Sequence, residues 1–346
     1  MLALTRQDTA VMKGIAICAM LCHHLYGFPP EGVEPYTGVL AWLGVLGKVC
    51  VALFLFCSGY GLAANYAPIS IKDDLKFIVR RLVKFYLNYW VIFLIFVPIT
   101  IFAFHRPLSA AYGEEYVWGH LILDIFGLQG WNSYNITWWF NTLIIILYLL
   151  FPLLYRAIRW KPWFAIIIGM IVMRLSTRVP FDALDLCLWQ FPFILGVVWK
   201  LYENKETHVQ EWLTAHRAIA IIGSVSMLIV TVIIRMYPII PHWSGMRIDG
   251  FVACAMALCV VTILRSFPRV MSTLSFLGKH SMNIYMMHTF FNAFYCKDLL
   301  HSGEWLRGGG NFVLLMIICL IISIVIEFMK EKIRYYECVK YITKRI

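Results

Sequence analysis

The sequence has few charged residues and no polar stretch long enough to separate folded domains. Only 14% of its 346 residues are Asp, Glu, Lys or Arg, whereas 61% are hydrophobic. A soluble domain of this length needs more polar surface than such a composition supplies. The scarcity of charge therefore excludes a soluble protein and predicts one that lies within a membrane.

A strict alternation of polar and apolar residues is also missing. The apolar runs are continuous and about 17–25 residues long, which excludes a β-barrel and indicates spanning helices. We count about ten such runs, among them residues 10–28, 39–66, 136–155, 162–178 and 311–329. No internal repeat, low-complexity segment or long linker interrupts them. We expect a single all-α membrane domain over residues 1–346, with no appended soluble domain.

Ten cysteines are present, but no CxxC pair occurs among them. Most of them lie inside predicted spans, so disulfides are not expected. Cys22, His23 and His24 could be read as metal ligands, but adjacent residues diverge on a helix and no second cluster completes a site. We therefore expect neither a bound metal nor a tightly bound cofactor.

Acidic residues are scarce relative to basic ones. The chain has 19 Asp and Glu against 30 Lys and Arg, which gives a formal net charge of +11. Such an excess can indicate a nucleic-acid partner, but most of these cations fall in alternate loops between predicted spans. That distribution is the positive-inside pattern of membrane proteins. It predicts that both termini are cytoplasmic and that the partner is the lipid bilayer, with no role for nucleic acid.

Against this apolar background, the segment from Lys13 to His24 reads KGIAICAMLCHH and places ionisable groups in the first predicted span. Such groups cost several kcal/mol within the bilayer unless they are paired or face water, so they indicate function. On a regular α-helix, Lys13 and His24 lie within about 20° of one face and about 16 Å apart. We expect the two to line one cavity. His23 points about a quarter-turn away and is the weaker candidate.

Other charges near the predicted inner surface admit two interpretations. The stretch IKDDLKFIVRRLVKFYLNYW contains Arg81 and Lys84, which share a helix face. They can contact anionic lipids, or they can form a cytoplasmic anion site. Lys13 can likewise be a lysine that extends its amine to the inner surface. Asp8 is expected to pair with Lys13 or with an arginine.

Two further spans carry polar side chains. His288 falls in the middle of the span that contains NIYMMHTFFNAFY, where a structural hydrogen bond and a catalytic role are equally open. The second span contains FLFCSGYGLAANY, whose small residues permit close helix packing. Within it, Ser58 and Tyr60 are expected to shape the cavity rather than react.

Together these elements resemble the acyltransferase family 3 proteins, integral membrane O-acyltransferases that decorate bacterial surface glycans. Members open with a basic residue, ten intervening positions and then a histidine, which here are Lys13 and His24. Lys13 and Lys84 stand where arginine is commoner in the family. The other matching strings follow in family order and extend the resemblance over nearly the full chain: Leu55 to Tyr60, Arg81 and Lys84, Trp138 to Phe140, Leu277 to Ser281, and Ile284 to His288.

The resemblance implies transfer of an acyl group, often acetyl, from cytoplasmic acyl-CoA to a sugar hydroxyl of the cell envelope. The protein would then be a multi-pass protein of the inner or plasma membrane. His24 is the candidate general base, or alternatively the nucleophile that carries the acyl group as an acyl-imidazole. The other implied site residues are His288 as a catalytic candidate, Lys13 at the CoA end of the path, and Arg81, Lys84, Ser58 and Tyr60 around the bound acyl-CoA.

Two other classes of function fit parts of the pattern. Buried ionisable residues near a broken helix also describe a proton-coupled secondary transporter or a flippase for a glycan or a small polar solute. The lack of inverted repeats and of acids in mid-span argues against that class. A membrane scaffold or sensor subunit is the third interpretation.

Overall fold

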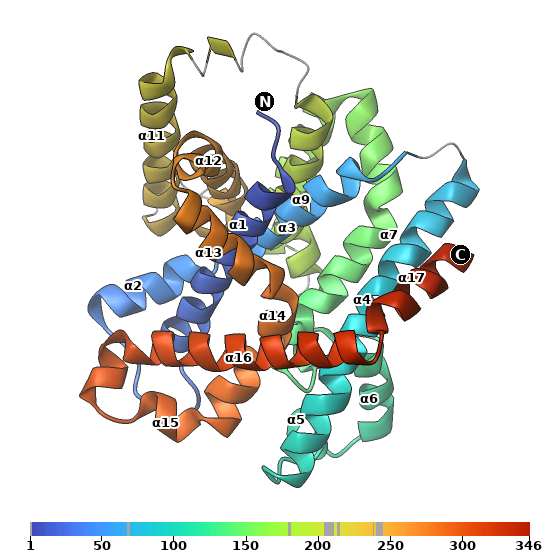
Figure 1. Cartoon of the computed structure of the whole chain (residues 1–346), viewed down its shortest axis with the longest axis vertical. Helices are drawn as coiled ribbons and strands as arrows, with labels where there is room; N and C mark the ends of the chain where they lie inside the picture. The colour runs from blue at the N-terminus through green and yellow to red at the C-terminus, as the bar shows by residue number, and fades with distance from the viewer. Residues whose placement is uncertain are drawn as a thin grey trace. The chain divides into compact units, whose positions relative to one another are not determined.

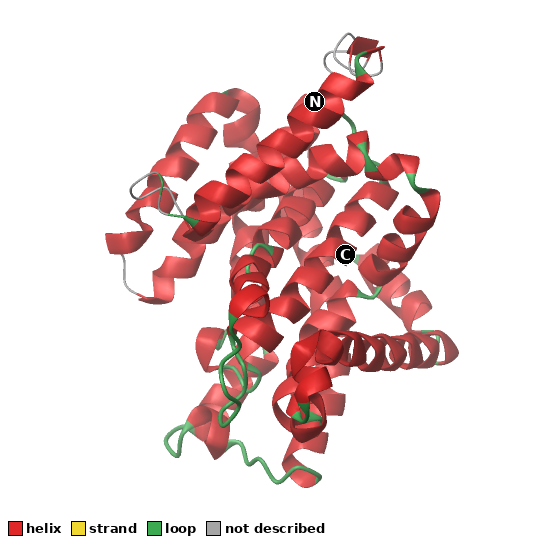
Figure 2. Ribbon diagram, turned by 90° about the vertical axis from the view of Figure 1, so that its left-hand side faces the viewer, coloured by secondary structure: helices red, strands yellow, loops and turns green. Residues whose placement is uncertain are grey.

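The computed structural model describes residues 2–67, 70–178, 181–203, 211–212, 215–237, 239 and 245–346. Within these ranges the chain forms helices, turns and loops, without a strand (Figure 2). Eight helical segments of the described chain are long and apolar enough to cross a membrane: Arg6–Gly27, Gly38–Ala64, Ile71–Phe102, Ile136–Trp160, Leu184–Tyr202, Arg217–Met236, Gly245–Ser266 and Leu306–Lys332. The prediction of a polytopic all-α membrane protein is confirmed.

Two of the expected spans are shorter than the apolar pattern suggested. Residues 162–178 form the 14-residue helix α8 (Pro162–Leu175) and a 3₁₀ turn, η4 (Ser176–Arg178). The span expected around His288 consists of α14 (Ser281–Phe290), which passes into a π-helical turn, η7 (Phe291–Tyr295). Apolar composition alone does not reveal such interruptions, because the side chains on either side of each break are equally hydrophobic.

The chain divides into two compact units, formed by residues 1–23, 42–66 and 153–281, and by residues 24–41, 67–152 and 282–346. Besides α8, the helices of the first unit are α1 (Arg6–Cys22), α3 (Cys50–Ala64), α9 (Phe181–Tyr202), α11 (Arg217–Met236), α12 (Asp249–Thr262) and α13 (Pro268–Lys279) (Figure 1). The second unit holds α4 (Ile71–Phe102), α5 (Ser109–Tyr112), α6 (Val117–Ile125), α14, α15 (Lys297–His301), α16 (Asn311–Lys332) and α17 (Tyr335–Arg345). Helices α2 (Gly38–Gly47) and α7 (Trp139–Trp160) have residues in both, and the first residue of α14 also belongs to the first unit. The expectation of a single domain stays a prediction.

Glycines allow helices of the first unit to approach each other closely. A Cβ atom on Gly278 of α13 would lie 1.8 Å from the carbonyl oxygen of Ala10, and one on Gly14 of α1 would lie 2.1 Å from that of Leu274. Both distances are far below van der Waals contact, so only glycine fits at these two positions. The contact fixes α1, and with it Lys13, against α13.

Buried charges in the first unit are paired, as a membrane interior requires. The Asp8 carboxylate accepts hydrogen bonds from Arg265, with Oδ2 2.6 Å from Nη2, and it also caps α1 through Thr5. Asp8 therefore pairs with an arginine, which was one of its two expected partners. Arg235 of α11 donates from Nε to Asp249 of α12 at 2.8 Å, and both side chains are buried.

Helix α16 of the second unit has one apolar face that the protein leaves uncovered. Its exposed hydrophobic side chains are Val313, Ile317, Ile321, Ile324, Val325, Phe328 and Met329, whereas Leu315, Cys319 and Ile326 are buried. The exposed residues recur at three- and four-residue spacing, so they share a face. In a membrane protein, lipid covers such a face.

Two of the strings that carried the resemblance meet in the second unit. The indole Nε1 of Trp138 donates to the carbonyl oxygen of Met286 at 3.0 Å. The hydroxyl of Tyr285 lies 2.8 Å from the carbonyl oxygen of Thr137 and 3.2 Å from Oδ1 of Asn141. These contacts join the start of α7 to α14 and thereby position His288, which follows one turn after Ile284.

Candidate functional site

Two π-helical turns and one kinked turn occur among the described residues, and each one carries polar groups of the candidate site. The π-turns are η1 (His23–Gly27) and η7, and the kinked turn is η8 (Leu306–Gly310), in which Gly309 has a φ of 117°. A π-turn holds an extra residue in the helix, leaves the regular hydrogen-bond pattern and is frequent at functional sites. Here the three turns supply His24, Asn292 and Arg307, respectively.

The first π-turn begins just before His24. The regular helix α1 ends at Cys22, and His23 begins η1. The expected offset of about 20° between Lys13 and His24 assumed α-helical geometry as far as His24, whereas a π-turn advances by a smaller angle per residue than an α-turn. The offset between the two residues stays a prediction.

His24 lies against His288, with the two ring centroids 4.8 Å apart and the ring planes inclined by 53°. His288 is fully buried, whereas His24 is partly exposed. Nδ1 of His288 lies 2.9 Å from the carbonyl oxygen of Tyr285, so this nitrogen carries a proton and donates it. In the neutral ring Nε2 is then an acceptor, and the Thr289 hydroxyl lies 3.4 Å from it.

His23 is separated from this pair. Its side chain is buried, and Nδ1 donates to the carbonyl oxygen of Gly44 at 2.8 Å. A Cβ atom on Gly47 would lie 2.8 Å from the backbone nitrogen of His23, so α2 packs tightly at this point. The buried environment of His23 agrees with its ranking as the weaker candidate site residue.

A chain of hydrogen bonds runs from the backbone of His24 through five polar side chains of the second unit. Nδ2 of Asn292 donates to the carbonyl oxygen of His24 at 3.1 Å, and its Oδ1 lies 3.0 Å from Nε2 of His301. Nδ1 of His301 lies 2.9 Å from the Tyr36 hydroxyl, which accepts from Nδ2 of Asn311 at 2.8 Å. The chain ends at Tyr26, whose hydroxyl donates to Oδ1 of Asn311 at 2.9 Å.

The donors and acceptors of this chain fix the tautomer of His301. Because Oδ1 of Asn292 can only accept, Nε2 of His301 carries the proton, and Nδ1 accepts from the hydroxyl of Tyr36. Every group then donates in the same direction, toward the carbonyl oxygen of His24. This neutral form of His301 leaves no partner in the chain unsatisfied.

Electrostatics at the outer end of the chain favour the same form. Burial lowers the pKa of His301, and the positive charges of Arg307 and Lys297 lower it further. Burial also raises the pKa of Tyr36, which keeps its hydroxyl protonated. The guanidinium carbon of Arg307 lies 5.0 Å from the centre of the Tyr36 ring.

Lys13 is a partly exposed cation of α1 in the first unit. Asp8, one of its expected partners, binds Arg265 instead, and no described carboxylate forms an ion pair with Lys13. One turn before it, the Thr9 carbonyl oxygen lies 3.8 Å from the sulfur of Cys57 on α3. The string that contains Cys57 and Ser58 therefore packs beside the helix of Lys13.

Ser58 and Tyr60 have different environments on α3. Ser58 is partly exposed, whereas Tyr60 is buried. The hydroxyl of Tyr60 lies 2.7 Å from the carbonyl oxygen of Leu4 and 2.6 Å from Oε2 of Glu203, and it accepts from the Leu4 amide at 3.2 Å. These contacts join the start of the chain to the end of α9. Tyr60 therefore has a structural role.

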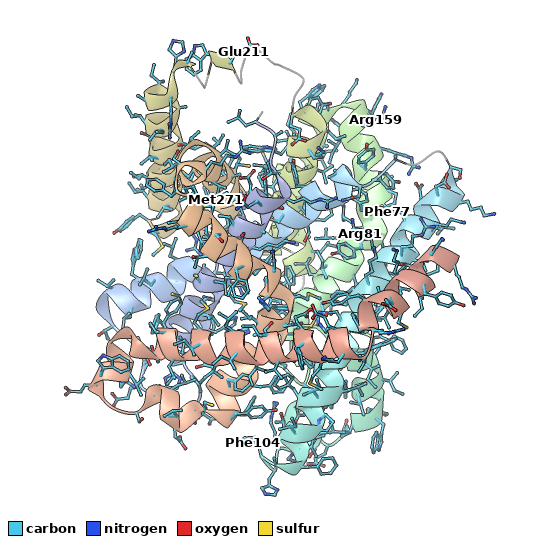
Figure 3. The ribbon with its side chains drawn as sticks, viewed as in Figure 1. Phe77, Arg81, Phe104, Arg159, Glu211 and Met271 are labelled. Carbon is cyan, nitrogen blue, oxygen red and sulfur yellow. The ribbon has the colours of Figure 1, made fainter. Side chains whose placement is uncertain are left out.

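Arg81 and Lys84 lie one turn apart on α4, which is a continuous helix through both residues, so their shared face is confirmed. Arg81 is partly exposed and rests over the ring of Phe77 at 5.4 Å (Figure 3). Lys84 is exposed, and neither residue forms an ion pair with a described carboxylate. Both charges therefore remain available to an anion.

The sequence did not single out a buried lysine of the second unit. Lys330 of α16 is 2% exposed, and its amine lies 2.8 Å from Oε1 of Glu327 and 3.2 Å from Oδ1 of Asn283. It also donates to Asn88, which lies one turn after Lys84 on α4. Because Lys330 follows directly on an apolar span, its sequence resembles an ordinary inner-surface lysine, and only the structure shows that it is buried.

The hydrogen-bonded chain from Asn292 to Tyr26 was missed for a related reason. Its members come from two distant parts of the sequence, and none of them matches a motif. The one available signal was the presence of Asn292 and Asn311 in apolar surroundings, where an unpaired amide is costly.

Comparison with known proteins agrees with the resemblance. A family model described as an acyltransferase domain matches residues 10–328 of the chain. The match includes His24, His288, Asn292, His301 and Arg307. The comparison with curated proteins found no match, and neither did the comparison with solved structures.

Proposed function

Because the chain belongs to acyltransferase family 3 and is a multi-pass membrane acyltransferase, we propose that it transfers an acyl group from acyl-CoA to a hydroxyl of a cell-envelope glycan. We take the group to be acetyl and the location to be the inner or plasma membrane. The observation that carries the proposal is the placement of His24, a partly exposed imidazole in a π-turn against the buried His288.

The reaction needs a base for the acceptor hydroxyl, and His24 supplies it. An imidazole accepts the proton while the hydroxyl oxygen attacks the thioester carbonyl carbon. The carbon–sulfur bond then breaks, and the CoA thiolate leaves and takes the proton from the imidazolium of His24. His288 donates from Nδ1 to a backbone carbonyl, which fixes its ring and leaves it to position the ring of His24.

The same residue can act as an acyl carrier in a two-step form of the reaction. A ring nitrogen of His24 then attacks the thioester first, CoA leaves, and the acceptor hydroxyl attacks the acyl-imidazole. In both forms the CoA phosphates need cations. Lys13, Arg81 and Lys84 have no described ion-pair partner, and we assign them to that end of the path, with Ser58 beside Lys13.

Transfer by the purified full-length protein in lipid nanodiscs tests the proposal. With radiolabelled acetyl-CoA and a cell-envelope glycan extract, the wild type should label the glycan, and His24→Ala should reduce the rate at least a hundredfold, since general base catalysis typically contributes about 10²–10⁴. His105→Asn, which changes an exposed loop histidine, should retain the wild-type rate.

Mass spectrometry of surface glycans from matched wild-type and His24→Ala cells identifies the acceptor. Loss of an O-acyl mass in the variant is the expected result. Identical spectra, or uphill uptake of a solute by vesicles that show no acyl transfer, would instead favour a transporter. Rapid acid quenching separates the two chemical forms, because only an acyl carrier leaves label on the wild-type protein.

A further inference from the structure

The second unit contains a cavity beside the outer end of the hydrogen-bonded chain. Its volume is about 380 Å³, in the range of small-molecule sites. Its lining residues, which define the Arg307 pocket, are Gly32, Val33, Glu34, Lys297, Asp298, His301, Ser302 and Arg307. The wall therefore combines the loop after η1, the helix α15 and the kinked turn η8.

The inner wall of the Arg307 pocket is positively charged. Lys297, His301 and Arg307 are partly buried, whereas the carboxylates of Glu34 and Asp298 are exposed to solvent. Burial lowers the pKa of His301, and the charges of Arg307 and Lys297 lower it further. Solvent screens the two exposed carboxylates, so they do not neutralise the inner wall.

Neither inner cation is paired with a carboxylate in the described chain. Arg307 donates from Nη2 to the carbonyl oxygen of Glu34 at 3.2 Å, and Lys297 donates to the carbonyl oxygen of Glu31. A guanidinium has five N–H donors, so Arg307 retains donors for a two-point contact with an anion. Its position in η8 and over the ring of Tyr36 restricts where those donors point.

The pocket is connected to the reacting histidine through one side chain. His301 lines the pocket and lies 3.0 Å from Oδ1 of Asn292, and Asn292 donates to the carbonyl oxygen of His24. A ligand held at Arg307 is thus next to the residues that position His24. The charge pattern of the sequence places both pocket loops on the outer side of the membrane, opposite the predicted CoA end.

We propose that the Arg307 pocket is the acceptor subsite, and that it takes a saccharide bearing a carboxylate or a phosphate group. The anionic group contacts Lys297 and Arg307, while sugar hydroxyls donate to the exposed carboxylates of Glu34 and Asp298. The assignment as an acceptor subsite rests on the proposed acyl transfer. Binding of an anionic sugar to the pocket can be measured without any transfer.

Chemical protection of Arg307 tests binding directly. The wild type in nanodiscs is treated with phenylglyoxal, which modifies arginine, and the adducts are quantified by peptide mass spectrometry. Glucuronate and glucose 1-phosphate represent the two anion types, glucose is the neutral control, and chloride equalises ionic strength. We expect at least one charged sugar to slow modification of Arg307 threefold or more, while glucose has no effect.

Arg334 provides the internal control in the same digest, because its side chain is 80% exposed and lies outside the pocket. Its modification should be unchanged by either sugar. Equal protection of Arg334, equal protection by glucose, or no protection by either charged sugar would overturn the proposal. So would an Arg307 that does not react, since a pocket open to a saccharide must admit so small a reagent.

A kinetic measurement addresses the acceptor itself. Arg307→Gln should raise the KM for the acceptor glycan tenfold or more and leave the KM for acyl-CoA unchanged, whereas Arg334→Gln should change neither. If a charged sugar protects Arg307 but neither the wild type nor any variant transfers an acyl group, anion binding at the pocket is supported and the proposed function fails. If transfer occurs and Arg307→Gln has the wild-type KM for the acceptor, the subsite fails alone.

Discussion

At the scale of single residues, the centre of the site is the environment of His24 rather than its sequence position. The pattern of Lys13 and His24 predicts that the first span is functional, and the pairing of Asp8 with an arginine was also anticipated. The contact of His24 with His288 was not, because 263 intervening positions carry no information on spatial proximity. Residues in motifs were predictable, and the residues that orient them were not.

Asn292 should be essential for positioning His24, although it touches no reacting atom. Asn292→Ala removes its hydrogen bonds to the His24 carbonyl oxygen and to His301. A lost buried hydrogen bond costs about 1–3 kcal/mol, so we expect kcat to fall about tenfold or more while the KM for acyl-CoA is unchanged. Asn65→Ala, at an exposed helix end, is the matched control. A wild-type kcat in Asn292→Ala would contradict this role.

His301 should make the stability of the protein depend on pH. Its pKa is lowered in the folded protein by burial and by nearby cations, so the unfolded chain binds more protons. The neutral form therefore contributes stability that is fully present above the unfolded pKa of about 6.5 and is lost as pH falls through the folded value. Thermal unfolding followed by tryptophan fluorescence from pH 7.5 to 5 should show a falling midpoint.

The comparison variants isolate the contribution of His301. In His301→Gln the midpoint should fall less over the same pH range, because glutamine does not titrate and can still donate to Asn292. His105→Asn, at an exposed loop position, should follow the wild-type curve. Parallel curves for the wild type and His301→Gln would assign the pH dependence to other groups.

At the scale of helices, the positions and faces of the long apolar helices could be predicted from the sequence, but the breaks within helices could not. The shared face of Arg81 and Lys84 required only helical periodicity, and α4 confirmed it. The π-turns were invisible because a single extra residue in an apolar run leaves the composition unchanged. The offset between Lys13 and His24 stays a prediction, because η1 begins just before His24.

The contact between α1 and α13 should tolerate no side chain at its glycines. Gly278→Ala would put a Cβ atom 1.8 Å from the Ala10 carbonyl oxygen, so the helices must separate. Overpacking of this kind costs about 1–3 kcal/mol, and we expect a lower midpoint of thermal unfolding and lower transfer activity. Gly223→Ala on α11, where nothing lies within 4 Å, should keep or raise the midpoint. Similar effects of the two substitutions would argue against the close contact.

Helices α11 and α12 should depend on their buried ion pair in a characteristic way. Arg235→Met leaves Asp249 buried without its partner, and breaking a buried pair costs about 3–5 kcal/mol. The double variant Arg235→Met, Asp249→Leu removes both charges and should recover most of the lost stability. A double variant as unstable as the single one would mean that packing, rather than charge, is responsible.

At the scale of the whole molecule, composition was sufficient for the fold class and the resemblance was sufficient for the family. The scarcity of charge predicted a polytopic helical protein, and eight helical segments of the described chain are long and apolar enough to cross a membrane. The Arg307 pocket was beyond reach, since it needs three segments that only the fold brings together.

The charge pattern predicts the orientation in the membrane, and a natural cysteine can test this prediction. Cys338 is exposed on α17, so a membrane-impermeant maleimide should label it in inside-out vesicles and not in intact spheroplasts. Glu114→Cys, in an exposed outer loop by the same prediction, should show the reverse pattern. Cys338→Ser identifies the background from the other thiols. Labelling of Cys338 in intact spheroplasts would invert the predicted topology.

The π-turns also limit how this chain can change in length. Removing one residue from η1 or η7 would narrow the turn and change the direction of the side chains within it. A deletion just before His24 would thus redirect its ring without altering any amino acid in contact with it. Gaps between this sequence and functional relatives should fall in the surrounding loops, and shortening a bulge should abolish activity in a protein that still inserts and folds.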